Sequence, residues 1–285
     1  MLFLTNYLSR MSLLAVVIFS TWSVVEAAQN RPMEVTMAYS FGDVFSYIGE
    51  LDSEAIFCIN IDSIIQHKYL GSPGWHESRL SKLSQRFGDF FKGKKRIAEE
   101  QVVIDTLIDK KCLEEHFLKE FEKLLELCPC PLLGISSLGI ESVPSTLKNL
   151  KACGIDFTAQ ECCRENFFLD SSEKCTESAL VQNGILFCSG LPVGEIIKKL
   201  FTLKNIKPKR IVFLSDDPEH IKAFGRECIE VGLTFLGIVY YPAAESIFHY
   251  IYPYSTAVEM QEEHVLTVIS NEMAQLSLDS LNQKS

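Results

Sequence analysis

Short, uninterrupted apolar runs, separated by stretches with helical spacing, constrain the fold of this chain most strongly. Runs of about 4–8 apolar residues are typical of strands buried on both faces of a parallel sheet. Parallel strands must be joined by long crossovers, which are usually helices. The pattern therefore predicts an α/β fold, a doubly wound and mostly parallel Rossmann-like sheet with helices on both faces. The predicted strands cover residues 55–61, 131–136, 155–157, 185–188, 210–215 and 233–240.

Helix signals lie in the segments between these runs. Residues 143–153 and 193–203 place apolar side chains at helical spacing. Asp217, Pro218 and Glu219 form a strong helix start. The Asp side chain can cap, the Pro ring fits the first turn, and the acidic Glu favours the positive end of the helix dipole.

Three other segments do not follow the strand and helix alternation. Residues 63–128 contain few strand signals, and 97–127 has the spacing of an amphipathic helix, so we expect a large helical insertion there. Residues 158–183 are polar and cysteine-rich and are expected to form an insertion or a long loop. Residues 243–285 are expected to form a mainly helical C-terminal segment.

The N-terminus predicts export. Residues 11–25 are apolar and uncharged, but they fall short of the ~18–20 residues needed to cross a bilayer. Small residues follow at Ala27 and Ala28, so we expect residues 1–28 to be a cleaved signal peptide. An uncleaved anchor and a buried helix are the alternatives. The mature protein is then expected in the periplasm, in the cell envelope or outside the cell, without a later membrane span.

Charge argues against one class of partner. The chain has 37 acidic and 27 basic residues and a net charge of -10. A nucleic-acid-binding protein usually carries a basic face. We therefore expect no nucleic-acid partner.

The chain has ten cysteines, all of which follow the predicted signal peptide. In an exported protein they would meet an oxidising environment. Structural disulfides, ordinary buried thiols and a metal site are all open, although no pair of CxxC motifs favours zinc. Cys128 and Cys130 are too close in sequence for an easy mutual bridge, so each is expected to pair elsewhere or stay free. Five cysteines lie close together in sequence, and we expect disulfides to link this segment more than any other. They are Cys153, Cys162, Cys163, Cys175 and Cys188.

Polar residues follow three of the predicted strands directly. Asn60 and Asp62 end the first, Ser136 ends the second, and Asp216 and Asp217 follow the strand at 210–215. Ligands of open parallel sheets bind at the carboxyl ends of the strands. If these strands are neighbours, the set would suit a hard divalent cation and an oxyanion such as phosphate. The alternative is that these residues only cap the helices that follow.

The order of these residues resembles the haloacid dehalogenase (HAD) superfamily of phosphohydrolases over residues 50–242. That family opens on an apolar strand and a D-x-D motif, which residues 60–62 (Asn-Ile-Asp) match in part. A Ser or Thr then follows the second strand, as Ser136 does here. Acidic residues follow a later strand, as Asp216 and Asp217 do here.

The chain is most similar to a branch of uncharacterised exported bacterial proteins, the DUF2608 type, in which a Leu-Gly-Ser-x-x-Trp element follows the first motif. Residues 70–75 read Leu-Gly-Ser-Pro-Gly-Trp. The resemblance implies a HAD-like core over residues 29–62 and 129–242, with residues 63–128 inserted as a helical cap. Such caps cover the site and exclude water.

Two departures from the family predict lost chemistry. The family's nucleophilic Asp is replaced by Asn60, and a carboxamide cannot form the aspartyl phosphate. The family's Lys is replaced by Val193. Asp62, matched to the general acid/base, and Ser136 are the catalytic positions that remain. Other lysines could substitute from a different place, namely Lys198, Lys199 or Lys204.

The resemblance also implies a Mg²⁺ site formed by Asn60, Asp62, Asp216 and Asp217. Mg²⁺ prefers carboxylate ligands, and Asn60 offers only a neutral oxygen. We therefore expect Mg²⁺ binding to be weak or lost.

These observations predict an exported HAD-like protein that lacks ordinary phosphatase activity and acts as a binding or interaction module. Its expected partner is a phosphorylated small molecule or a protein. One alternative is an active Mg²⁺-dependent phosphatase, a phosphoric monoester hydrolase with relocated catalytic groups. Another is an envelope structural protein linked through disulfides.

Overall fold

The computed structural model describes residues 33–49, 51–67, 71, 73–107, 109–158, 165–170 and 178–243. The predicted signal peptide lies outside the described residues, and so does the C-terminal segment after Ala243. The statements below concern the described residues.

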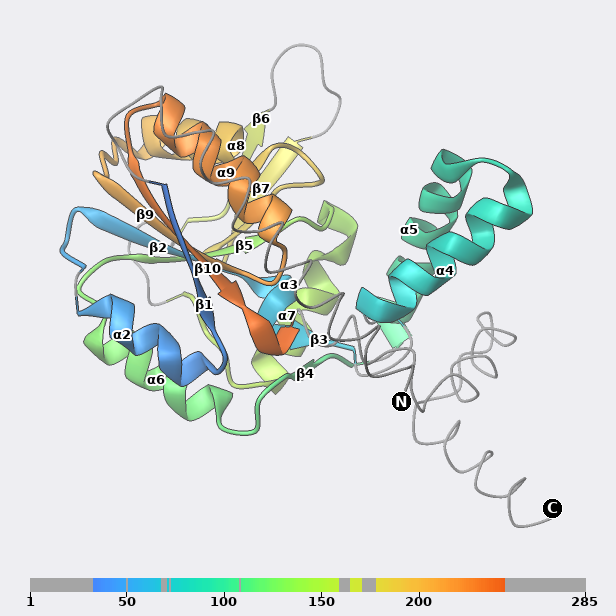
Figure 1. Cartoon of the computed structure of the whole chain (residues 1–285), viewed down its shortest axis with the longest axis horizontal. Coiled ribbons are helices and arrows are strands. Elements are labelled where there is room, and N and C mark those ends of the chain that lie inside the picture. The colour runs from blue at the N-terminus through green and yellow to red at the C-terminus, as the bar shows by residue number, and fades with distance from the viewer. Residues whose placement is uncertain are drawn as a thin grey trace, which may run out of the picture.

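A central sheet of eight strands confirms the predicted α/β, Rossmann-like fold (Figure 1). The strand order is β1-β10-β9-β2-β5-β8-β7-β6, and the pairs from β1 to β8 are parallel. At the other edge, β6 and β7 run antiparallel to their neighbours. The strands are β1 (Met33–Ala38), β2 (Ala55–Asn60), β5 (Leu132–Ser136), β6 (Phe167–Asp170), β7 (Ser178–Gln182), β8 (Ile185–Phe187), β9 (Arg210–Ser215) and β10 (Thr234–Tyr240).

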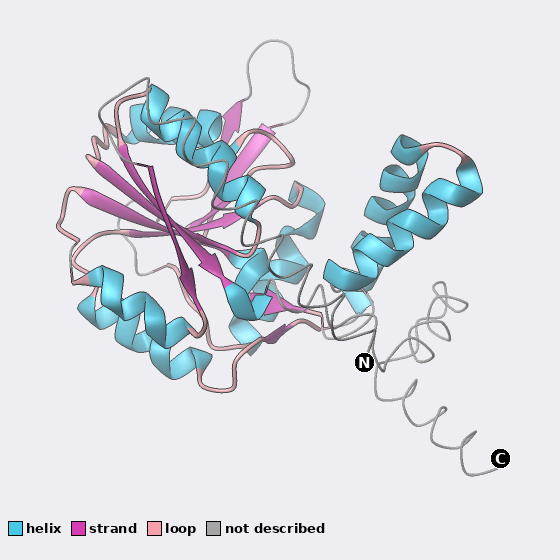
Figure 2. Ribbon diagram, viewed as in Figure 1, coloured by secondary structure: helices cyan, strands magenta, loops and turns pink. Residues whose placement is uncertain are grey.

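Helices cover both faces of the sheet, as Figure 2 shows. One face packs against α2 (Phe45–Ile48), α6 (Phe117–Leu127) and α7 (Val143–Ala152). The other face packs against α8 (Val193–Lys204) and α9 (Pro218–Glu230). Successive residues of a strand point to opposite faces, so Phe57 and Ile59 enter the first layer while Ile56 and Cys58 enter the second. Both faces are apolar, which explains why the central strands read as continuous apolar runs.

Two long helices, α4 (Pro73–Phe87) and α5 (Phe90–Leu107), pack against each other and stand clear of the sheet layers (Figure 1). Glu100 of α5 is buried and joins the two helices. Its carboxylate accepts two hydrogen bonds from the Arg79 guanidinium of α4, each 2.9 Å long.

The expected single helix over 97–127 is wrong. Helix α5 ends at Leu107, a short strand β4 (Lys111–Cys112) pairs with β3 (Ile65–Gln66), and a separate helix α6 follows. The amphipathic spacing continues across the break, because both helices have one apolar face, and spacing alone does not reveal the intervening strand.

Helix α6 lies on the sheet, although the sequence placed it in the inserted segment 63–128. Phe117 and Phe121 are fully buried, and both rings lie beside the Phe41 ring in tilted arrangements. Just before α6, the Glu114 carboxylate accepts the Phe41 backbone N–H at 2.7 Å. Helix α6 thus contributes to the same apolar layer as α2 and α7.

Other elements differ locally from the expectations. Residues 155–157 are not a strand, although Phe157 is buried in the core. The segment 158–183, expected to form an insertion or a long loop, supplies β6 and β7, which extend the sheet. Strand β1 and helix α2 were not expected, because β1 is only partly buried and α2 is a single turn.

Helices α7, α8 and α9 begin where the sequence predicts. Helix α9 starts after Asp217, whose carboxylate accepts the Glu219 backbone N–H at 2.8 Å. No helix among the described residues is long and apolar enough to cross a membrane.

Candidate functional site

The candidate site lies where three neighbouring parallel strands, β9, β2 and β5, end at the same edge of the sheet. The chain order changes direction at β2, because later strands are added on both of its sides. A change of this kind opens a crevice at the carboxyl edge of a doubly wound sheet. The predicted convergence of these strand ends is therefore present.

Asn60 ends β2 and caps the short helix α3 (Ile61–Ile64). Its Oδ1 accepts the Asp62 backbone N–H at 3.1 Å. Its Nδ2 donates to Ser215 Oγ at 3.1 Å and to Asp216 Oδ1 at 3.5 Å. Both ends of the amide are used, and the side chain is buried, so Asn60 is fixed as a structural connector between β2 and β9.

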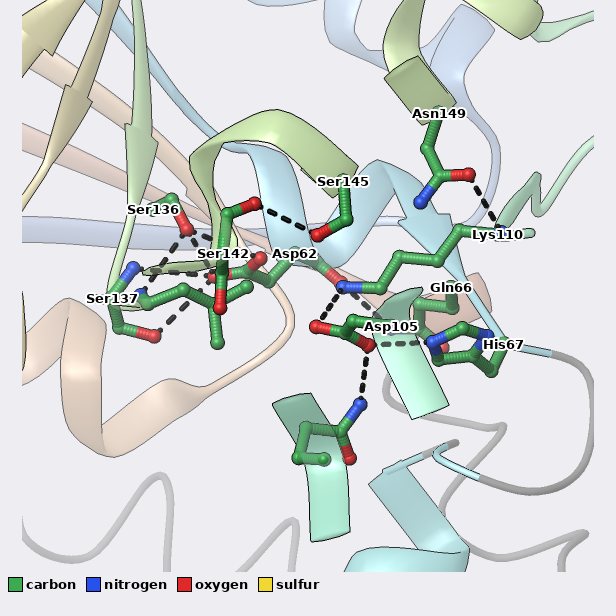
Figure 3. Close-up of polar contacts among 12 residues, drawn as sticks. Asp62, Gln66, His67, Asp105, Lys110, Ser136, Ser137, Ser142, Ser145 and Asn149 are labelled. Carbon is green, nitrogen blue, oxygen red and sulfur yellow. Dashed lines mark hydrogen bonds and ion pairs between the residues drawn. The ribbon is translucent and has the colours of Figure 1, made fainter. Parts of the chain in front are cut away.

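Asp62 points to the end of β5 (Figure 3). Its carboxylate accepts the Ser136 hydroxyl at 3.1 Å, the Ser137 backbone N–H at 3.2 Å and the Ser137 hydroxyl at 3.3 Å. Burial raises the pKa of Asp62, and the positive charge of Lys110 and these hydrogen bonds oppose the rise. The structure therefore brings Asp62 and Ser136 together.

Asp216 is bound on the opposite side of β2. Its Oδ1 accepts the Ser63 hydroxyl at 2.7 Å, and its backbone N–H donates to the same Ser63 oxygen at 3.0 Å. Burial raises the pKa of Asp216 as well. Asp217 is exposed, and its carboxylate caps α9, which is the alternative role considered from the sequence.

The donor set does not fit Mg²⁺ in this arrangement. Asp62 turns toward Ser136 and Asp216 turns toward Ser63, so their carboxylates serve different hydrogen-bond networks. The Asn60 oxygen is occupied by a backbone N–H. Within the described ranges, no group of three or more His, Cys, Asp or Glu side chains could hold a metal ion.

Lys110 supplies a positive charge that the sequence reasoning missed. It is buried, and its Nζ lies 3.4 Å from Asp105 Oδ2. Its backbone N–H donates to Asn149 Oδ1 of α7 at 3.1 Å. Figure 3 shows the side chain extending toward Asp62. No motif marks Lys110, because it precedes β4 in a segment that only the tertiary fold brings to the strand ends.

The lysines considered from the sequence lie elsewhere. Lys199 pairs with Glu195 at 3.0 Å on the outside of α8, and Lys204 pairs with Glu165 at 2.6 Å. Lys198 is exposed on the same helix. Val193 is buried in the apolar layer between the sheet and helices α8 and α9, so its side chain does not join Asp62.

His67 extends this polar network toward α5. Its Nε2 lies 2.7 Å from Asp105 Oδ1, which also accepts Gln101 Nε2 at 2.7 Å. Burial lowers the pKa of His67, so the neutral ring donates its Nε2–H to Asp105. Burial alone would raise the pKa of Asp105, but the His67 hydrogen bond and the Lys110 charge hold it below its ordinary value.

This protein is thus an α/β protein with a Rossmann-like sheet and a cluster of polar side chains at the carboxyl ends of its central strands. Residues 39–275 match the family described as "Protein of unknown function (DUF2608)", and the chain belongs to that family. A Chlamydia pneumoniae protein, provisionally named an outer membrane protein, is 23% identical over 218 residues, covering 73% of this chain and 78% of that protein. No solved structure matches the chain.

Proposed function

We propose that this protein is an exported, HAD-like binding or interaction module whose strand-end site no longer transfers phosphoryl groups. The observation that carries the proposal is Asn60, at the position that matches the nucleophilic Asp of the HAD superfamily. Its amide oxygen accepts the Asp62 backbone N–H, and its amide nitrogen donates to Ser215 and Asp216. A neutral amide engaged in this way cannot attack phosphorus.

Export is supported by two observations. Residues 1–28 have the composition of a signal peptide, although they lie outside the described residues. The related Chlamydia pneumoniae protein is named for the outer membrane. We therefore place the mature protein in the cell envelope or outside the cell.

The groups around Asp62 suit an oxyanion. Two serine hydroxyls and the Ser137 backbone N–H already bind a carboxylate, and the Lys110 ammonium extends toward the same place. Phosphate groups are bound by the same donors. The proposed ligand is a phosphorylated small molecule or a phosphate-bearing group of a partner protein.

Turnover of a generic phosphate monoester, p-nitrophenyl phosphate, tests the proposal. The mature wild-type protein with Mg²⁺ should show no more turnover than its Asp62→Ala variant. Mg²⁺-dependent turnover of the wild type that Asp62→Ala abolishes would overturn the proposal. Binding of inorganic phosphate, measured by calorimetry, should weaken in Lys110→Ala and remain in Lys198→Ala, since Lys198 is exposed on α8.

The active phosphatase with relocated catalytic groups remains a second candidate, because Lys110 supplies a cation near Asp62. This candidate predicts wild-type turnover that both Lys110→Ala and Asp216→Asn abolish. The leading proposal predicts no wild-type turnover for either substitution to remove.

A further inference from the structure

The segment that leads into β4 lies beside helix α7. Lys110 donates its backbone N–H to Asn149 Oδ1 at 3.1 Å, and Cys112 and Cys153 both pack against the same apolar layer. Asn149 and Cys153 are four residues apart, about one turn along the same helix face. Lys110 and Cys112 are two residues apart in extended chain, which advances by about the same length.

The two thiols also affect each other's ionisation. Their interaction raises the pKa of Cys112 and lowers the pKa of Cys153 to about 7. Cys112 and Cys153 are both half-buried against the apolar layer that holds α6 and α7. Both cysteines are free thiols in this structure.

We propose that Cys112 and Cys153 form an intramolecular disulfide that fastens β4 to α7. The geometry points to this pair because the Lys110–Asn149 hydrogen bond sets the two segments in a register that places Cys112 beside Cys153. The pair is far apart in sequence, so the link closes a long loop and constrains the unfolded chain. It also fastens the segment that carries Lys110 beside Asp62.

The reaction needs a small-molecule disulfide as oxidant, such as oxidised glutathione. One protein thiolate attacks a sulfur of that disulfide, releases one small thiol and forms a mixed disulfide. The second protein thiolate then attacks the protein sulfur of the mixed disulfide and releases the second small thiol. Two protein thiols are oxidised, one small disulfide is reduced to two thiols, and the two protons are transferred to those thiols.

Cys128 and Cys130 provide the comparison. Their sulfurs lie 3.4 Å apart, and both are free thiols. Only Pro129 separates them, so a bond between them would close almost no loop and would stabilise the fold little. Cys128→Ser is therefore a matched control.

Peptide mapping of the full mature protein tests the pairing. The protein is incubated with oxidised glutathione or with dithiothreitol, its free thiols are alkylated, and the digest is analysed by mass spectrometry. We expect the Cys112 and Cys153 peptides to be joined only after oxidation. Alkylation of either cysteine after oxidation would overturn the inference, and so would a link from either to another cysteine, including Cys162, Cys163 or Cys175 outside the described residues.

Thermal unfolding of the same samples tests the consequence. Oxidation should raise the Tm of the wild type and of Cys128→Ser, whereas Cys112→Ser and Cys153→Ser should lose that rise equally. An equal rise in all four proteins would contradict the inference. If the serine variants do not fold, the wild-type map decides alone. Neither result depends on turnover, so failure of the inference is distinguishable from failure of the proposed function.

Discussion

Asn60 joins the ends of two central strands through its side-chain amide. Its amide nitrogen donates to Asp216. An aspartate at this position could not make that bond when ionised and would bring a second negative charge near Asp216. Two carboxylates that share a site raise each other's pKa. The amide therefore avoids repulsion between two carboxylates at the ends of β2 and β9.

The raised pKa of Asp62 predicts how stability depends on pH. Its ordinary value is 3.8, and burial raises it in the folded protein. A raised carboxyl pKa contributes stability below the unfolded value, and that contribution is lost as pH rises through the folded value. The free energy of unfolding should therefore fall between about pH 4 and the folded-state pKa, and Asp62→Asn should flatten this part of the decline.

Urea unfolding of both proteins at several pH values across this window measures the effect. Asp217→Asn is the control, because Asp217 is exposed and asparagine caps a helix equally well. A wild type and an Asp62→Asn variant with parallel pH profiles would contradict the assignment.

At the scale of elements, the α4–α5 pair depends on a buried charge. Glu100 is almost fully buried and accepts hydrogen bonds from Arg79 of α4 and, at 3.0 Å, from Arg96 of its own helix. Burial raises the pKa of Glu100, but the two arginines together hold it below its ordinary value. The ion pair between Glu100 and Arg79 therefore joins α4 to α5, whose outer faces are largely exposed.

Glu100→Ala should destabilise the α4–α5 pair by about 1–3 kcal/mol, because it leaves the Arg79 guanidinium without its buried hydrogen-bond acceptor. Hydrogen exchange should accelerate in α4 and α5 while the sheet stays protected. Glu99→Ala is the matched control, since the exposed Glu99 side chain pairs with Arg96, at 3.5 Å, on the surface of α5. Equal acceleration in both variants would show that Glu100 does not join the helices.

At the scale of the whole molecule, the sheet separates two apolar layers, and α6 belongs to one of them. Phe121 contacts Phe117 and Phe157 as well as Phe41, so it connects α6 to a segment before β2 and to a segment after β5. A helix packed in this way should unfold together with the sheet. It should not unfold with α4 and α5.

Phe121→Ala should lower the global free energy of unfolding by about 3–5 kcal/mol, because it leaves a cavity in the shared layer. Phe91→Ala should change it little, because Phe91 of α5 is 81% exposed. Denaturant unfolding followed by circular dichroism gives both values. Similar, small effects of the two substitutions would mean that α6 is not part of the cooperative core.

Much of the fold could be predicted from local patterns. The apolar runs at 55–61, 131–136 and 210–215 became central parallel strands, since continuous burial on both faces leaves a continuous apolar sequence. The start of α9 could also be predicted, because a capping residue and a first-turn proline act within a few residues of each other. Strand β1 escaped prediction because it is a partly buried edge strand.

The residues of the candidate site could be predicted only in part from the sequence. Asn60, Asp62, Ser136 and Asp216 were found because each follows a predicted strand. Lys110 was not found, because a salt bridge to Asp105 and a hydrogen bond to Asn149 bring it there from a different part of the chain.

The sequence by itself determined the α/β class, the order of the central elements and the polar residues at the ends of the central strands. Only the tertiary structure decided which groups face Asp62, that α6 covers the sheet, and that the segment of Cys112 lies beside the helix that ends at Cys153. The physical reason is the sequence separation over which each kind of interaction acts. Backbone propensity, capping and burial periodicity act between near neighbours, whereas these contacts join segments far apart in sequence, and packing alone sets their distances.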